Sequence, residues 1–219
     1  MSETRHPIGK AAFDAPFQAE LLKLFRWRRD VRRFRRDPIS ESVVENLLAT
    51  GSLAPSVGLS EPWRFVLVAD SARRNQILEC FKTCNAEALQ AQPDDRAAAY
   101  ARLKLEGLED APVHVAVFAD QATAQGHGLG RLTMPQTIEY SAVMAIHTIW
   151  LAARAEGIGM GWVSILEPSR VAEILDVPTG WTFVGYLCIG YPVEELETPV
   201  LEREGWERRR DARVAILRR

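Results

Sequence analysis

The sequence is poor in cysteine, histidine and lysine, and each shortage removes a class of chemistry. Its cysteines are Cys80, Cys84 and Cys188, an odd number without the C-x-x-C spacing of redox sites, so we expect reduced, buried thiols. The 4 histidines are scattered and share no metal-ligand spacing with each other or with cysteine, so no metal site is predicted. Lysines are few among the 27 basic residues, which leaves arginine as the dominant cation.

Long apolar runs and a strong charge imbalance are also missing. No run of about 18 apolar residues occurs and none follows residues 1–5, so we expect no membrane span, no signal peptide and a cytoplasmic protein. The net charge of -2 argues against a nucleic-acid or anionic-membrane surface, so the expected partner is a small molecule. The 219 residues do contain 47% hydrophobic residues, enough for one sizeable core.

Apolar periodicity predicts a mobile arm at residues 1–16, a folded domain at residues 17–192 and a charged arm at residues 193–219. Helices are predicted from residue 17 up to residue 28, at 40–51, as a pair within 71–106, at 136–156 and at 168–177, with strands at 63–69, 113–119, 158–165 and 181–189. The pattern alone leaves α/β and α+β folds open.

The predicted helix at residues 136–156 is apolar nearly all round. Such a helix must be buried on several sides, at the centre of the fold or at a subunit interface. A dimer formed across it satisfies both, so we expect a homodimer. The arm at residues 193–219 is charged and carries Trp206 and three consecutive arginines, so we expect it to wrap the partner subunit.

Residues 28–32, Arg-Arg-Asp-Val-Arg, crowd three guanidinium groups around one carboxylate. The guanidinium fork matches phosphate oxygens and is always charged. A solvated charged surface is the alternative interpretation, because three more arginines follow closely. The interleaved Phe25, Val31 and Phe34 favour partial burial, and therefore a phosphate site.

Glycine and proline mark three further segments. A loop at residues 53–62, held by two prolines, leads into a predicted strand and places a site there. Gly159 and Gly161 would let a backbone or a ligand approach their strand closely. Residues 126–130 read G-x-G-x-G, which differs from the dinucleotide fingerprint, and are interpreted as a flexible loop.

Four motifs together resemble the nitroreductase superfamily, over roughly residues 17 to 210. They are the pentad at 28–32, Ala-Pro-Ser-Val-Gly at 54–58 with Pro-Trp-Arg-Phe-Val at 62–66, Lys-Leu-Glu-Gly at 104–107, and Leu-Ala-Ala-Arg-Ala-Glu-Gly at 151–157 with Gly-Trp-Val-Ser-Ile at 161–165. Asp30 stands where ordinary nitroreductases commonly carry a small polar residue. With the serine of Gly-Trp-Val-Ser, it makes the chain look like the 5,6-dimethylbenzimidazole synthase branch.

The resemblance implies an α+β fold, a three-layer sandwich with a central mixed sheet flanked by helices, and a homodimer that binds FMN at the subunit interface. It implies an oxidoreductase that consumes its flavin. Reduced FMN, supplied by a separate flavin reductase, would react with O2 and be fragmented to 5,6-dimethylbenzimidazole and erythrose 4-phosphate. The alternatives are an NAD(P)H-dependent nitroreductase or flavin reductase and a non-catalytic flavin-binding protein.

The resemblance also implies roles for individual residues at the flavin. Those expected at the phosphate and ribityl end are Arg28, Arg29, Asp30, Val31 and Arg32, with Arg209 reaching the phosphate from the C-terminal arm. Pro55 and Ser56 would line the ring edge, and Trp162, Val163 and Ser164 would lie against the isoalloxazine.

Asp30 and Ser164 are the predicted catalytic residues. Asp30 would contact the ribityl hydroxyls or the oxygenated flavin and accept a proton, and Ser164 would hydrogen-bond to the ring. The alternatives are a structural salt bridge for Asp30 and a strand serine bonded to a neighbouring carbonyl for Ser164.

Overall fold

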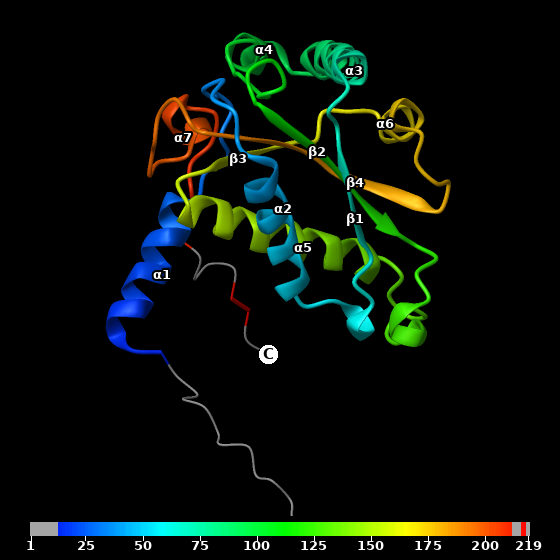
Figure 1. Ribbon diagram of the computed structural model, residues 1–219. Helices are drawn as coiled ribbons and strands as arrows, with labels where there is room; N and C mark the ends of the chain where they lie inside the picture. Colours follow the sequence, from blue (N-terminus) through cyan, green and yellow to red (C-terminus); the bar gives the residue numbers. More distant parts are fainter. Residues whose placement is uncertain (1–12, 212–215, 218–219) are drawn as a thin grey trace, which may run out of the picture.

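A four-stranded sheet forms the centre of the computed structural model, which describes residues 13–211 and 216–217 (Figure 1). The strand order is β1-β2-β4-β3 and every neighbouring pair is antiparallel. The strands are β1 (Trp63–Leu67), β2 (Val113–Asp120), β3 (Gly159–Val163) and β4 (Trp181–Gly190). The sheet was predicted to be mixed, but its four strands are all antiparallel. Among the described residues the parallel pairing is an isolated bridge between Asp30 and Met160.

Helices cover both faces of this sheet, so the predicted α+β sandwich of three layers is confirmed (Figure 1). On one face α5 and α2 pack against alternate strand residues such as Val115 and Leu187. On the other, α3 and α6 close around Phe118 and Tyr186. The helices are α1 (Ala15–Trp27), α2 (Glu41–Ala49), α3 (Ser71–Gln90), α4 (Asp94–Tyr100), α5 (Thr137–Ala155), α6 (Pro168–Leu175) and α7 (Val200–Arg203), with 3-10 turns η1 (Thr50–Leu53), η2 (Val57–Leu59) and η3 (Gln125–Gly128).

The first helix begins at Ala15 rather than Phe17, because Asp14 caps it by accepting a hydrogen bond from the Phe17 amide at 3.0 Å. Residues 1–12 of the predicted arm lie outside the described residues. Arg28 caps the other end of α1, so the arginine pentad follows this helix as predicted. The second helix starts at the predicted cap, Ser40.

The pentad is docked along the outer edge of β3. The Val31 amide donates to the Met160 carbonyl at 3.1 Å. A Cβ on Gly159 would lie 2.9 Å from Val31 Cγ2, and one on Gly161 would overlap the Val31 carbonyl oxygen. The close approach predicted at these glycines is therefore confirmed, and the approaching backbone is the chain's own.

Several predicted elements end earlier than expected, two of them near the site. The helix predicted up to residue 106 stops at Tyr100, and residues 103–107 form an irregular loop instead, followed by a turn at 108–110. The third strand stops at Val163, so Ser164 lies just beyond it. The glycine-rich residues 126–130 contribute to η3, where a Cβ on Gly126 would lie 2.6 Å from the Gly58 carbonyl oxygen of η2.

Within residues 13–211 and 216–217, no helix combines the length and the apolar character needed to cross a membrane.

Candidate functional site

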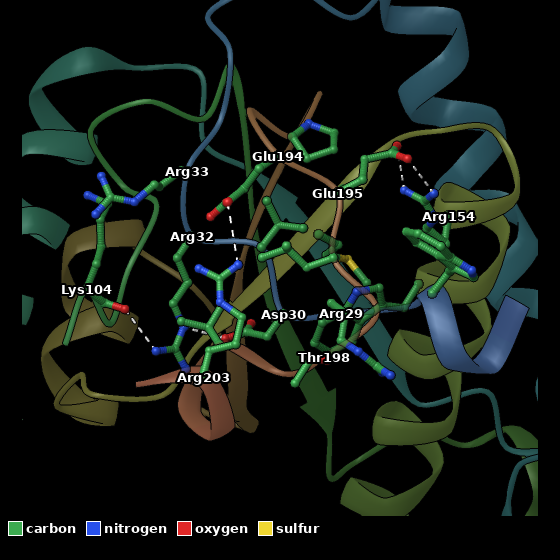
Figure 2. Close-up of a pocket in the computed structure, with 18 of the residues that line it drawn as sticks. Arg29, Asp30, Arg32, Arg33, Lys104, Arg154, Glu194, Glu195, Thr198 and Arg203 are labelled. Carbon is green, nitrogen blue, oxygen red and sulfur yellow. Dashed lines mark hydrogen bonds and ion pairs between the residues drawn. The ribbon is translucent and has the colours of Figure 1, made fainter. Parts of the chain in front are cut away.

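The arginine pentad borders a cavity of about 150 Å³ between β3 and the C-terminal residues (Figure 2). Its basic lining residues are Arg29, Arg32, Arg33, Arg102, Lys104, Arg154 and Arg203. Its carboxylates are Asp30, Glu194, Glu195 and Glu204. Cations outnumber carboxylates, so this cavity suits an anion. We call it the arginine pocket.

Asp30 fastens the pentad to the sheet and orients one arginine. One carboxylate oxygen, Oδ1, accepts from the Trp162 amide at 2.9 Å, and Oδ2 accepts from Arg32 Nε at 2.7 Å. Arg32 Nη1 in turn donates to the Lys104 carbonyl at 2.8 Å. Asp30 thus forms the structural salt bridge that was the alternative to a catalytic role. Because its side chain is 33% exposed, a chemical role for it stays open as a prediction.

The first two arginines of the pentad are crowded by positive charge. Arg28 lies over the Trp150 ring of α5, 4.9 Å from its centroid, and Arg29 donates to the Glu197 carbonyl. Burial, followed by the charge of Arg209, lowers the pKa of Arg28 and that of Arg29. The charge of exposed Arg209 thus acts on this cluster within one chain, and a bound anion would relieve the repulsion. The contact of Arg209 with a phosphate stays a prediction.

The described part of the C-terminal arm crosses the arginine pocket of its own chain. Arg154 donates two hydrogen bonds to Glu195, at 2.8 and 3.0 Å, and Arg203 lies 3.6 Å from Glu194 (Figure 2). Farther along, Trp206 meets Tyr100 edge-on, with centroids 6.0 Å apart. Contacts of this arm with a partner subunit stay a prediction.

Pro55 and Ser56 do not join the arginine pocket. They border a separate shallow hollow with Tyr140 and Met144 of α5, whereas Arg28 stacks on Trp150 near the other end of this helix. From residue 140 to residue 150 an α-helix rises by about 15 Å. The residues predicted for the ring edge and for the phosphate are therefore far apart along α5 in one chain.

The three residues predicted against the isoalloxazine face different ways. Val163 is 2% exposed and packs into the core beneath α3 and α6, so only its main chain could meet a ligand. Trp162 lies on the opposite face of β3, where its indole would overlap a Cβ on Gly185. Ser164 is exposed beyond the strand and is accessible.

Sequence reasoning missed Lys104 and Arg154 as lining residues of the pocket. Both stand in the quoted motifs, Lys-Leu-Glu-Gly and Leu-Ala-Ala-Arg-Ala-Glu-Gly, which were given no role of their own. For Arg154, a basic residue inside a largely apolar motif was the signal that could have found it.

Comparison with known proteins decides the family, because residues 25–191 match the Nitroreductase family. The chain belongs to the nitroreductase family. Over 198 residues it is 62% identical to the 5,6-dimethylbenzimidazole synthase of Rhodospirillum rubrum, covering 90% of this chain and 94% of that protein. It is 48% identical over 195 residues to a protein of the same name from Rhodobacter capsulatus, covering 89% and 94%.

Among solved structures, iodotyrosine deiodinase bound to FMN and 3-iodo-L-tyrosine matches with a TM-score of 0.68 at 21% identity. The match covers 80% of this chain and 91% of that chain, and it shows a shared fold. The resemblance to the 5,6-dimethylbenzimidazole synthase branch, and the expectation of an enzyme, are confirmed by the relatives at 62% and 48% identity.

Proposed function

We propose that this protein is a 5,6-dimethylbenzimidazole synthase. In this reaction reduced FMN, delivered by a separate flavin reductase, is fragmented with O2 to 5,6-dimethylbenzimidazole and erythrose 4-phosphate. The observation that carries the proposal is a carboxylate, Asp30, fixed inside an arginine pocket of a nitroreductase-family chain. The similarity to two proteins with this activity in their names supports it.

The arginine pocket supplies the phosphate end of the site. Arg29 and Arg32 offer rigid donors in the pocket, Arg28 lies over Trp150, and Arg209 adds charge nearby. The cavity of about 150 Å³ is large enough for a phosphate group. It is smaller than the smallest typical ligand pockets, which have volumes of roughly 300 Å³. A whole flavin therefore needs more surface than this cavity offers.

A second subunit can supply that surface. One face of α5 exposes Tyr140, Val143 and Met144, which are 55%, 38% and 42% accessible, and α1, which packs near the C-terminal end of α5, exposes Leu21 and Phe25. We call these residues the apolar face. A two-fold axis that crosses this face perpendicular to α5 would pair α5 with its copy in the opposite direction, in an isologous dimer. The partner's Pro55 and Ser56 then come to the Trp150 end of α5, beside Arg28. This supports a homodimer with the flavin between the subunits.

Asp30 and Ser164 are the proposed catalytic residues. Reduced flavin supplies the electrons for the reaction with O2. Asp30 is held by two hydrogen bonds at a known orientation, so it can accept a proton from a ribityl hydroxyl without reorganising. Exposed Ser164 offers one hydroxyl that can hydrogen-bond to the flavin ring.

A cytoplasmic location stays a prediction.

The test is to incubate the protein aerobically with FMN and a separate flavin-reducing system, and to follow products by chromatography. We expect 5,6-dimethylbenzimidazole, and none without protein or without O2. Oxidation of NAD(P)H by the protein alone, without this product, would instead indicate a flavin reductase or nitroreductase. Flavin binding with no turnover of either kind would indicate a non-catalytic flavin-binding protein.

A further inference from the structure

A second carboxylate, Glu106, lies next to the arginine pocket on the loop at residues 103–107. Its side chain is 10% exposed, and both of its oxygens accept hydrogen bonds from neighbouring residues of the chain. Oε1 accepts from Lys104 Nζ at 2.9 Å, and Oε2 accepts from the Leu108 amide. The loop also packs tightly against the core, because a Cβ on Gly107 would overlap the Phe34 ring. Glu106 is therefore immobilised.

This loop is connected to the pentad through Lys104. Lys104 lines the arginine pocket, whereas Glu106 does not. The Lys104 carbonyl accepts the Arg32 hydrogen bond, and Arg32 also donates to Asp30 (Figure 2). A continuous set of contacts thus runs from Glu106 through Lys104 and Arg32 to Asp30. Loss of its first member would free both a cation of the pocket and the carbonyl that orients Arg32.

We propose that Glu106 is a positioning residue for phosphate binding, which holds Lys104 and, through the Lys104 carbonyl, Arg32 in the geometry that binds the phosphate of FMN. This inference rests on the proposed function for the identity of the ligand. It assigns Lys104 as a further phosphate-binding cation and Glu106 as the group that acts through it.

The direction in which FMN affinity changes when Glu106 loses its charge separates a positioning role from a purely electrostatic one. A carboxylate near a phosphate repels it, so removal of the Glu106 charge should tighten FMN binding if charge alone mattered. A positioning residue gives the opposite result, because the freed lysine pays conformational entropy to bind the anion.

We therefore compare Glu106→Gln with wild type by fluorescence titration of oxidised FMN, which requires no turnover. We expect FMN to bind about tenfold more weakly, the size of one weakened charge-assisted bond. Riboflavin, which lacks the phosphate, should change by less than about twofold by the same reasoning. Glu109→Gln removes an exposed carboxylate from the neighbouring surface and is the matched control, with wild-type affinity expected.

A double-mutant cycle with Lys104→Met tests whether Glu106 acts through the lysine. If it does, Glu106→Gln has little further effect on FMN affinity in the Lys104→Met protein, because contacting residues are not additive. In turnover assays the Glu106→Gln protein should show a higher KM for reduced FMN with kcat unchanged.

Equal or tighter FMN binding by a folded Glu106→Gln protein would overturn the inference, as would equal weakening of riboflavin. Should Glu106→Gln fail to fold, Lys104→Met alone decides, and unchanged FMN affinity in that variant is the contradicting result. Failure of the proposed function is recognised separately. Wild-type protein would then form no dimethylbenzimidazole, whatever the effect of Glu106→Gln on FMN affinity.

Discussion

The arginine pocket and the apolar face are the two regions that a flavin would touch, and they are completed differently. In the pocket, Asp30, Arg32 and Arg154 each bond to partners of the same chain. On the apolar face, Val143 and Met144 of α5 are exposed, and so is Leu21 of α1, which lies towards the C-terminal end of α5. The comparison teaches that the polar contacts of the pocket are complete within one chain, whereas in the proposed dimer the exposed apolar face would be covered by a second subunit.

The most severe way to disturb the polar half is Asp30→Asn. The amide can accept only one of the two hydrogen bonds that now come from Trp162 and Arg32, and it cannot take up a proton. We expect dimethylbenzimidazole formation to fall about a thousandfold, within the range of a lost general base. FMN affinity should stay within about tenfold of wild type, since a single hydrogen bond is lost.

Product yield per bound FMN, from chromatography and fluorescence titration of the same sample, measures this. If the bound fraction of the Asp30→Asn protein turned over at the wild-type rate, Asp30 would be a structural residue only.

The apolar face is broken by Val143→Arg, which places two like charges opposite each other across a two-fold axis. We expect a monomer in sedimentation at micromolar concentration and about a hundredfold less product, because a buried unpaired charge costs several kcal/mol. Leu67→Arg is the control, since Leu67 is exposed on the edge strand β1 and away from this face. A Val143→Arg protein that remained dimeric and active would show that the subunits meet elsewhere.

The stability that the core loses in acid should be the same in a monomer and in the proposed dimer, because the groups responsible lie within one chain. Buried His114 donates from Nε2 to the Ala111 carbonyl and accepts at Nδ1 from the Tyr186 hydroxyl, at 3.1 Å each. Burial, with help from the charge of Arg74, lowers the pKa of His114 to about 4.

The unfolded chain therefore takes up this proton below about pH 6.5, and the folded chain does so only near pH 4. Stability is fully present above pH 6.5 and falls as the pH drops towards 4. We expect about 2 kcal/mol of unfolding free energy to be lost between pH 7 and pH 5 from this group.

Urea unfolding at both pH values measures the loss, which should be smaller in His114→Gln and unchanged in the Val143→Arg monomer. An equal loss in His114→Gln would assign the acid sensitivity to other groups.

The smallest expected effect on turnover is that of Ser164→Ala. Ser164 is exposed, and a single hydrogen bond to the flavin ring is proposed for it. The fold and most of the FMN affinity should be retained, while turnover falls by about tenfold for one lost hydrogen bond. Wild-type product yield from this variant would remove Ser164 from the catalytic site.

Much of the framework could be predicted from the sequence, since local signals decide it. Ser40 caps α2 as predicted, Arg28 ends α1, and Gly159 and Gly161 mark the close approach of the pentad to β3. The pentad also borders a cavity, as its mixture of arginine and apolar residues indicated.

Other features depend on contacts that periodicity does not encode. The segment from Gly159 to Ile165 has hardly a polar residue, so alternation could not tell which face receives Val163 and which receives Trp162. The crossing of the pocket by the C-terminal arm rests on distant ion pairs such as Arg154–Glu195. The role of Lys104 rests on its contact with Arg32, far away in the sequence.

Complementation between two inactive variants tests most directly whether the flavin site is shared between subunits. One chain carries Arg32→Glu, which reverses a charge in the polar half of the site. The other carries Ser56→Arg, which blocks the ring edge. Each chain has a different tag, so that the mixed dimer can be purified. In a shared site the mixed dimer has one site with both halves intact, so it should form dimethylbenzimidazole at about half the wild-type rate. A mixed dimer as inactive as either variant alone would contradict the account, because each site would then lie within a single chain.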